Sequence, residues 1–336
     1  MKRYLTITAL LLTMGLSACT HKELCTDHYP HAFRNHINVI ADYRQDWEEC
    51  CGGTDWEYRW PDDYIPYDEL RPGLPSGLRV VAYNEKGDHN IHNIKPHGGV
   101  VTLYDGVNDL LFYNNDTEYI IFSRNGATTR ATTRTRTRAS YIGNTYANEG
   151  EVTVAPPDML YANYIEDYFS KEVLEPTDVE VTLQPLVYTY KVRYEFEDGL
   201  KYVSMADGAL SGMAKSVDLN TGETSSEAAT VLYDCEITDY GIRAIVNSFG
   251  APGYPHPNYP TRTENKHALN LRVRLRNGRD STFEWNVTDQ VKAQPHGGVI
   301  VVKGIVIPEE VGTQGSEGFD VEVDDWGEYE DVPLPL

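Results

Sequence analysis

The sequence predicts an all-β protein made of two β-sandwich domains in tandem, joined by a short helix. Apolar and polar residues alternate in short runs from about residue 75 to about residue 308, and Gly, Asn and Asp separate the runs. This spacing is typical of β-sandwiches. In addition, the segment Pro-His-Gly-Gly occurs twice, at 96–99 and at 295–298. A turn in equivalent places of two similar domains is the simplest explanation of this repeat.

The clearest strands are 188–196 and 269–275. In 269–275, leucine and valine alternate with asparagine and arginine, which predicts one face against a core and one cationic face in water. The turn 197–199 favours a hairpin between 188–196 and 200–203. Further strands are expected at 79–83, 100–104, 110–113, 119–122, 179–183, 230–233, 242–246, 282–287 and 299–307.

One segment, 158–174, carries apolar residues at helical spacing. Asp158 is a suitable N-cap for this helix. Pro156, Pro157 and Pro176 interrupt the chain on both sides of it. The apolar positions are Leu160, Tyr164, Ile165, Tyr168 and Phe169. We therefore expect a connector helix within 158–178, between one sandwich at 75–157 and a second at 179–308.

A threonine-arginine alternation, 130–138, stands out in an otherwise acidic chain. Such alternation favours an extended backbone, and a charged edge resists unwanted pairing, so we interpret it as an exposed loop or edge strand. The alternatives are a docking patch for an acidic partner and a site for an arginine-specific protease.

Composition argues against nucleic-acid binding and gives no catalytic motif. The formal net charge is -22, with 51 acidic residues, which disfavours contact with phosphate backbones. No nucleophile elbow, phosphate-binding loop or zinc-protease motif occurs. Adjacent acids such as Asp62-Asp63 could serve a glycosidase, but in so acidic a chain they are more often a solvated face. We predict a protein that is not an enzyme and needs no cofactor.

Metal binding is the less favoured interpretation of two residue sets. His97 and His296 of the repeat lack the carboxylate or histidine neighbours that ligands usually have. The four cysteines after residue 19 show no zinc spacing, and two disulfides of open connectivity are the simpler expectation. These cysteines are Cys25, Cys50, Cys51 and Cys235.

The N-terminus reads as a lipoprotein signal peptide, 1–18. Lys2 and Arg3 precede an apolar run, and Leu16-Ser17-Ala18-Cys19 has the pattern of a lipobox. We expect cleavage before Cys19 and a diacylglycerol and N-acyl lipid on this cysteine, which anchors the protein in the outer membrane. An ordinary secretory signal with a chance cysteine is the alternative.

The acidic C-terminal tail, 309–336, contains one alternating run. Phe319, Val321 and Val323 alternate with acids in a region too acidic to fold alone. This pattern favours a strand that needs a partner edge, as a donor strand does, although it is also compatible with pairing inside its own domain.

The chain resembles the fimbrillin-type surface lipoproteins of the Bacteroidales, which belong to the superfamily of type V pilus subunits and anchors. The segments that carry the resemblance are 113–122, 210–213, 217–222, 248–250, 283–291 and 297–308. The most similar branch of these lipoproteins has mature chains that begin much as Cys19–Cys25 does here. The resemblance implies two transthyretin-like, Greek-key sandwiches and pili assembled by β-strand exchange. In that scheme an arginine-specific protease removes a first strand, here within 19–74, and the candidate sites are Arg34, Arg44, Arg59 and Arg71.

The sequence therefore predicts a lipid-anchored, surface-exposed fimbrial subunit or anchor whose partners are other fimbrial subunits. A monomeric surface lipoprotein that binds a glycan or a host ligand is the alternative. Its contact surface would be the loop 250–260, which is rich in proline and tyrosine.

Overall fold

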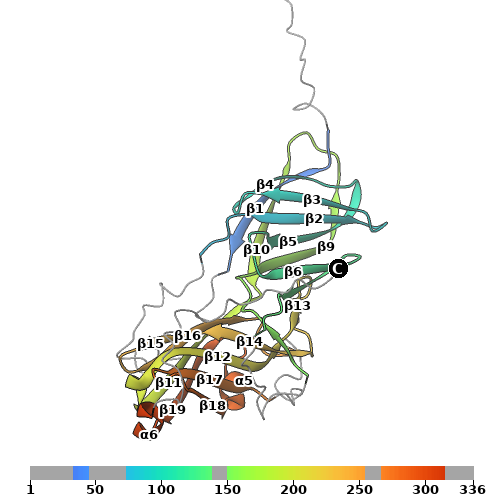
Figure 1. Ribbon diagram of the computed structural model, residues 1–336. Helices are drawn as coiled ribbons and strands as arrows, with labels where there is room; N and C mark the ends of the chain where they lie inside the picture. The colour runs from blue at the N-terminus through green and yellow to red at the C-terminus, as the bar shows by residue number, and fades with distance from the viewer. Residues whose placement is uncertain (1–32, 45–72, 138–149, 254–265, 315–336) are drawn as a thin grey trace, which may run out of the picture.

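The computed structural model describes residues 33–44, 73–137, 150–253 and 266–314. Two β-sheet halves lie end to end, with most of the residues before 186 in one half and most of the later ones in the other (Figure 1). Among the residues described, no helix is long and apolar enough to cross a membrane. The predicted all-β class is confirmed.

A seven-stranded sheet builds the first half. Its strands in spatial order are β3 (His89–Ile94), β2 (Leu78–Asn84), β5 (Gly106–Asn114), β9 (Tyr161–Ser170), β10 (Thr177–Pro185), β1 (His36–Tyr43) and β4 (Gly98–Thr102). Side chains from β1, β4 and β10 share one core with those from β2, β5 and β9. Val39, Val101 and Leu183 meet Val80 and Phe112 there. The sheet thus wraps around its own core, and β1 is an inner strand.

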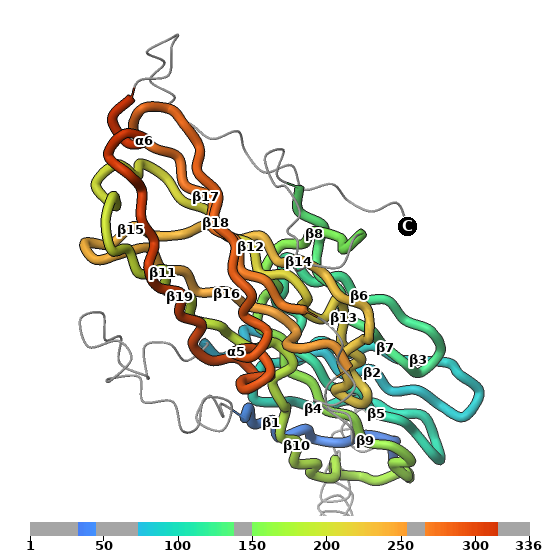
Figure 2. Tube along the Cα trace, turned by 90° about the horizontal axis from the view of Figure 1, so that it is seen from below, coloured from blue at the N-terminus to red at the C-terminus, as the bar shows by residue number. Residues whose placement is uncertain are grey.

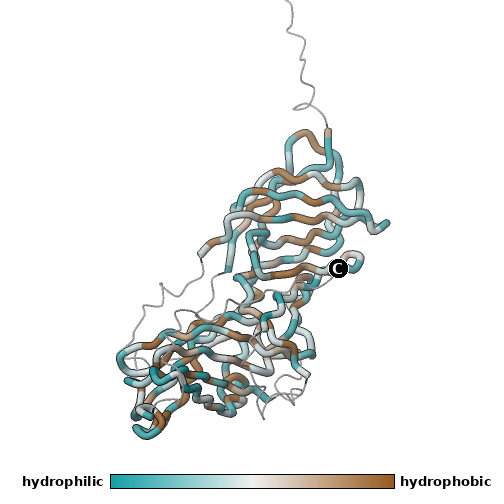
Figure 3. The backbone as a smooth tube through the Cα atoms, viewed as in Figure 1, coloured by the Kyte–Doolittle hydropathy of each residue, from teal (hydrophilic) through white to brown (hydrophobic). Residues whose placement is uncertain are grey.

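The second half is a sandwich of two sheets. One contains β15 (Glu236–Thr238), β16 (Gly241–Ser248), β11 (Tyr188–Asp198) and β19 (Gly298–Val306). The other contains β18 (Asp280–Asn286), β17 (Ala268–Leu275), β12 (Val203–Ala214), β14 (Ala228–Asp234) and β8 (Val152–Val154). Tyr194, Leu271 and Ile300 belong to the core between them. Figure 3 shows the apolar positions recurring along the strands of both halves, as burial of one face requires.

A small third sheet ties the halves together. Its strand order is β13 (Ser216–Asp218), β7 (Thr128–Thr133) and β6 (Ile120–Asn125), so β13 of the second half pairs with β7 of the first (Figure 2). In return, β8 of the first half pairs in parallel with β14. Tyr83, Leu111, Val217 and Phe249 bury their side chains in the core at this junction.

The arginine-threonine segment lies largely in this junction. The expectation of an exposed loop or edge strand was wrong for β7, because β7 lies between β13 and β6 and its Ala131 and Thr129 are fully buried. Further along, Arg136 donates to the carbonyl oxygen of Leu232 at 3.1 Å and to Asp234 at 3.3 Å. Arg136 of this segment therefore helps to join the halves.

Most predicted strands are confirmed, and one hairpin is not. Each range expected from period-two alternation coincides with a strand: β2, β4, β5, β6, β10, β11, β14, β16, β17, β18 and β19. The hairpin across 197–199 was wrong, since Leu200–Tyr202 forms a 3-10 turn and β11 and β12 belong to different sheets. The chain crosses between the two layers of the sandwich at this turn, which Gly199 opens with a φ of 88°.

The predicted connector helix within 158–178 was also wrong, because these residues form β9 and the start of β10. Tyr164 faces the junction core while Ile165 faces the first core, so β9 is apolar on both faces. A bulge then shifts its register against β5, and Asp167 has a φ of 54°. Two apolar faces and one extra residue imitate helical spacing. Asp158 accepts hydrogen bonds from the backbone of Glu118 and Tyr119 at 2.7 and 2.5 Å instead of capping a helix.

The residues 179–185, which we assigned to the second domain, pair within the first sheet as part of β10. A transthyretin-like topology for either half remains a prediction.

Both Pro-His-Gly-Gly segments form a turn that opens a strand. β4 and β19 each begin inside the glycine pair. In each case a tyrosine of the neighbouring strand donates its hydroxyl to the proline carbonyl: Tyr43 to Pro96 at 2.8 Å and Tyr190 to Pro295 at 3.1 Å. The two turns therefore make the same contact with β1 and β11, although β4 runs antiparallel to β1 and β19 runs parallel to β11.

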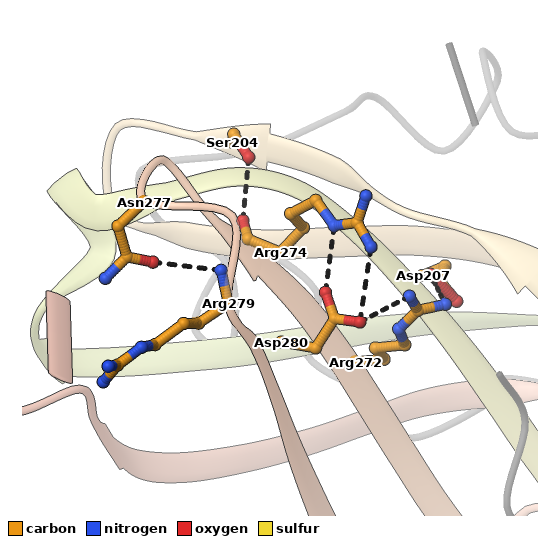
Figure 4. Close-up of polar contacts among 7 residues, drawn as sticks. All are labelled: Ser204, Asp207, Arg272, Arg274, Asn277, Arg279 and Asp280. Atoms are coloured by element: carbon orange, nitrogen blue, oxygen red, sulfur yellow. Dashed lines mark hydrogen bonds and ion pairs between the residues drawn. The ribbon is translucent and has the colours of Figure 1, made fainter. Parts of the chain in front are cut away.

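The cationic face predicted for 269–275 is neutralised rather than free in water. Arg272 donates to Asp280 at 2.7 Å, and Arg274 donates to both oxygens of Asp280 at 3.0 and 3.4 Å (Figure 4). Asp207 lies 3.9 Å from Arg272. Burial opposes ionisation of Asp280, but the hydrogen bonds from both arginines hold the pKa of this carboxyl below its usual value. The neighbouring strand β18 supplies this compensating charge.

A buried histidine should make the second half acid-sensitive. His267 is fully buried, and burial together with the Lys292 cation lowers its pKa to about 4 from 6.5. The unfolded chain binds this proton below pH 6.5 and the folded one does not, so stability should fall by about 3 kcal/mol between pH 6.5 and 4. Denaturant unfolding against pH should show a shallower slope for His267→Gln. An unchanged slope would contradict this assignment.

Candidate functional site

The strand β1 fills a slot between β10 and β4, which we call the β1 slot. β1 pairs in parallel with β10 from Ile37 to Tyr43 and in antiparallel with β4 from His36 to Ile40. It is therefore hydrogen-bonded on both sides. Its removal would leave two open strand edges facing each other, the arrangement that a further strand can fill.

Every second side chain of β1 points into the core. Ile37, Val39, Ala41 and Tyr43 are each no more than 6% exposed. The residues between them face outward: Asn38 donates to Asp178 on β10 at 2.8 Å, and Ile40 is 43% exposed. An occupant of the β1 slot thus needs apolar residues at alternate positions, and each buried side chain of valine or isoleucine size contributes roughly 1.5–3 kcal/mol.

Arginines stand at both ends of β1. Arg34 forms a two-way backbone bridge with Val173, with N···O distances of 3.0 and 2.9 Å. Arg44 donates its backbone N–H to Leu183 at 2.9 Å and its guanidinium to Gln184 at 3.3 Å. A cut after Arg44 would separate β1 from everything that follows it, whereas a cut after Arg34 would leave β1 attached to the body of the protein.

The turn at the start of β4 is shaped to the backbone of β1. Gly98 has a φ of 120°, and a Cβ at this position would lie 1.8 Å from the carbonyl oxygen of Val39. Only glycine permits this approach. The corresponding residue of the second repeat, Gly297, has the same relation to the carbonyl oxygen of Thr189 in β11, at 2.4 Å.

Tyr43 closes the far end of the β1 slot. Its ring meets that of Tyr161 edge-on, with centroids 5.3 Å apart. Burial, followed by the charge of Asp116 and the neighbouring Tyr161, raises the pKa of Tyr43 to about 12. Tyr43 is therefore protonated at neutral pH, as a donor to Pro96 must be.

The structure describes two of the predicted site residues and places them at opposite ends of one strand. Arg34 and Arg44 flank β1, which was not among the strands expected from alternation, although 19–74 was expected to hold a first strand. The period-two pattern of 37, 39, 41 and 43 could have revealed it. The other predicted residues lie outside the described ranges: Cys19, Arg59, Arg71, Phe319, Val321 and Val323, together with Cys25, Cys50 and Cys51.

Neither histidine of the repeats belongs to a metal site in the described ranges. There, no group of three or more His, Cys, Asp or Glu side chains is placed to hold an ion. His296 stacks on Tyr188 with centroids 4.5 Å apart, and burial lowers its pKa to about 4. His97 offers its carbonyl oxygen to the backbone of Ala41 at 3.1 Å. Both histidines thus serve as turn residues.

The fold and the β1 slot define an all-β protein whose first sheet encloses an N-terminal strand between two others. A family model, described as a domain of unknown function, DUF5119, matches residues 67–234, which is half of the chain. The protein belongs to the DUF5119 family.

One named relative and several solved structures are similar to the chain. It is 24% identical over 193 residues to the "Putative fimbrium anchoring subunit Fim4B" of Bacteroides ovatus, and the match covers 56% of each chain, little more than half of that relative. A crystal structure of "a putative adhesin from Bacteroides ovatus" shares the fold, with a TM-score of 0.54, 19% identity and coverage of 87% of this chain and 99% of that one. "The fimbrial anchor protein Mfa2 from Porphyromonas gingivalis" is a more distant match, with a TM-score of 0.40, 11% identity and coverage of 79% and 90%.

Proposed function

We propose that this protein is a non-enzymatic subunit or anchor of a fimbrium on the cell surface. The observation that carries the proposal is β1, an N-terminal strand bordered by arginines and buried between two others. The similarity to a protein named as a fimbrium anchoring subunit supports it, as does the fold shared with a protein named as an adhesin.

The assembly step we propose is β-strand exchange at the β1 slot. An arginine-specific cut after Arg44, or after Arg59 or Arg71 further on, frees β1 together with the segment before it. A strand from a neighbouring subunit then fills the same place, and the alternating Phe319, Val321 and Val323 of the tail have the pattern that the slot accepts. If the chain is uncut, the lipid on Cys19 holds it in the outer membrane and β1 stays in place, as suits an anchor.

The N-terminus of the protein taken from the cell surface tests this proposal. Intact mass and N-terminal sequencing should find either an acylated Cys19 in protein that co-isolates with fimbriae, as an anchor requires, or a new N-terminus after one of these arginines, as a polymerising subunit requires. An N-terminus at Asn35 would leave β1 in its slot and contradict the exchange step. Acylated Cys19 in protein that is never associated with fimbriae would support the alternative, a monomeric surface lipoprotein that binds a glycan or host ligand.

A further inference from the structure

The edge of β19 is covered by two glutamine side chains. β19 lies at one end of its four-stranded sheet, and the helix α5 (Thr288–Ala293) precedes it and lies beside its start (Figure 2). The amide of Gln290 accepts from the backbone N–H of Val301 at 2.9 Å and donates to its carbonyl at 3.0 Å. Gln294 makes the same pair of bonds with Val299, at 2.8 and 3.0 Å.

These four bonds reproduce what a neighbouring strand would supply. Alternate residues of a strand direct their N–H and C=O to the same side, so Val299 and Val301 are successive positions of the outer edge of β19. Gln290 and Gln294 are four residues apart and project together from one side of the chain. We call this pair the edge clamp.

A charged side chain and an irregular backbone protect the rest of the β19 edge from pairing with another strand. The next outward position is Lys303, whose side chain is 72% exposed and 3.3 Å from Glu195. Gly304 follows with a φ of 79°, and the register against β11 shifts beside it. Lysine and bulges are two of the means by which proteins prevent edge-to-edge pairing.

The first half differs at the same point of the repeat. Lys95 stands where Gln294 stands in the second copy, and lysine has donors but no acceptor, so it cannot bond a backbone N–H. β4 is likewise an edge strand, and its outward Val100 is 56% exposed. The two halves thus share a turn but differ in how the edge beside it is closed.

We propose that the edge clamp, Gln290 with Gln294, keeps a second copy of this chain from pairing with β19. A consequence, which rests on the proposed function, is that of the two strands opened by the Pro-His-Gly-Gly repeat, only β4 in the first half keeps an edge without such a clamp. The clamp itself requires no fimbrium and can be tested on the purified full chain, so its failure and that of the proposed function are separable.

The test is the double variant Gln290→Ala and Gln294→Ala, with Gln314→Ala as a control that follows another short helix, α6 (Glu309–Thr313). At dilution, hydrogen exchange at the amides of Val299 and Val301 should be about tenfold faster in the double variant and unchanged in the control. Sedimentation at rising concentration should then show an association step that wild type and control lack. A folded double variant that keeps both amides protected, or that never associates, would overturn the proposal.

A third substitution identifies the surface that associates. Val301→Pro removes the outward N–H while sparing the bonds to β11, and edge strands tolerate proline at such positions. Added to the double variant, it should restore the monomer; association that persists would place the contact elsewhere and refute the clamp. If the double variant does not fold, each single variant removes one glutamine of the edge clamp. Gln290→Ala should then accelerate hydrogen exchange only at Val301, and Gln294→Ala only at Val299.

Discussion

Val39→Asp is expected to destabilise the protein by about 4 kcal/mol, whereas Ile40→Asp should change stability by less than about 0.5 kcal/mol. Val39 is 2% exposed and packs in the core of the first half, so a carboxylate there loses its hydration without a partner. Ile40 is the adjacent residue of the same strand, is 43% exposed and faces outward. The two variants carry the same new charge and differ only in the face of β1 that bears it.

Urea unfolding of both variants, followed by far-UV circular dichroism, measures this difference. If β1 occupies its slot as described, Val39→Asp lowers the transition midpoint strongly and Ile40→Asp leaves it near wild type. Equal effects would mean that β1 is not packed against the core. Because the second half has its own core, the loss in Val39→Asp should appear first in hydrogen exchange of β2, β5 and β10.

Gly98→Ala should cost about 3 kcal/mol or more, and Gly87→Ala about 1 kcal/mol. Both glycines have positive φ, 120° and 84°, so both substitutions strain the backbone. Only at Gly98 does a Cβ meet the chain, 1.8 Å from the carbonyl oxygen of Val39, while nothing lies within 4 Å of the one at Gly87. The difference between the two losses of stability measures the effect of the close approach of β4 to β1.

Thermal unfolding of the two glycine variants is the measurement. A much larger loss for Gly98→Ala, with faster exchange of the β1 amides, is expected because β4 must retreat from its partner. Equal losses would mean that backbone strain alone is being measured and that the Pro-His-Gly-Gly turn does not shape the β1 slot.

Local alternation was sufficient to predict the strands that bury one face. Leu269 to Leu275 and Tyr188 to Phe196 have this pattern, and both form strands. It failed for β9, because a strand buried on both faces and bulged at Asp167 has no clean period of two. The strands of three residues that join the halves, β8 and β13, are too short to show any period.

The candidate site could be predicted only in part, for a similar reason. Arg34 and Arg44 are two of the four candidate cut sites, but that they flank one paired strand depends on contacts with Val173 and Leu183, which are far away in the sequence. The inward positions of β1 alternate without a break, but the apolar residue Ile40 on the outward face makes this alternation less evident. The edge clamp was not foreseen, because a glutamine's role depends on which backbone lies beside it.

Whether this protein is part of a fimbrium is the central claim, and fractionation of the cell surface tests it most directly. Fimbriae sheared from the cells should contain this chain, at their base if it is an anchor or along their length if it is a subunit, as immunogold labelling and electrophoresis of the unheated polymer can show. A chain found only as a monomer spread over the surface, with fimbriae unaltered when its gene is deleted, would contradict the account.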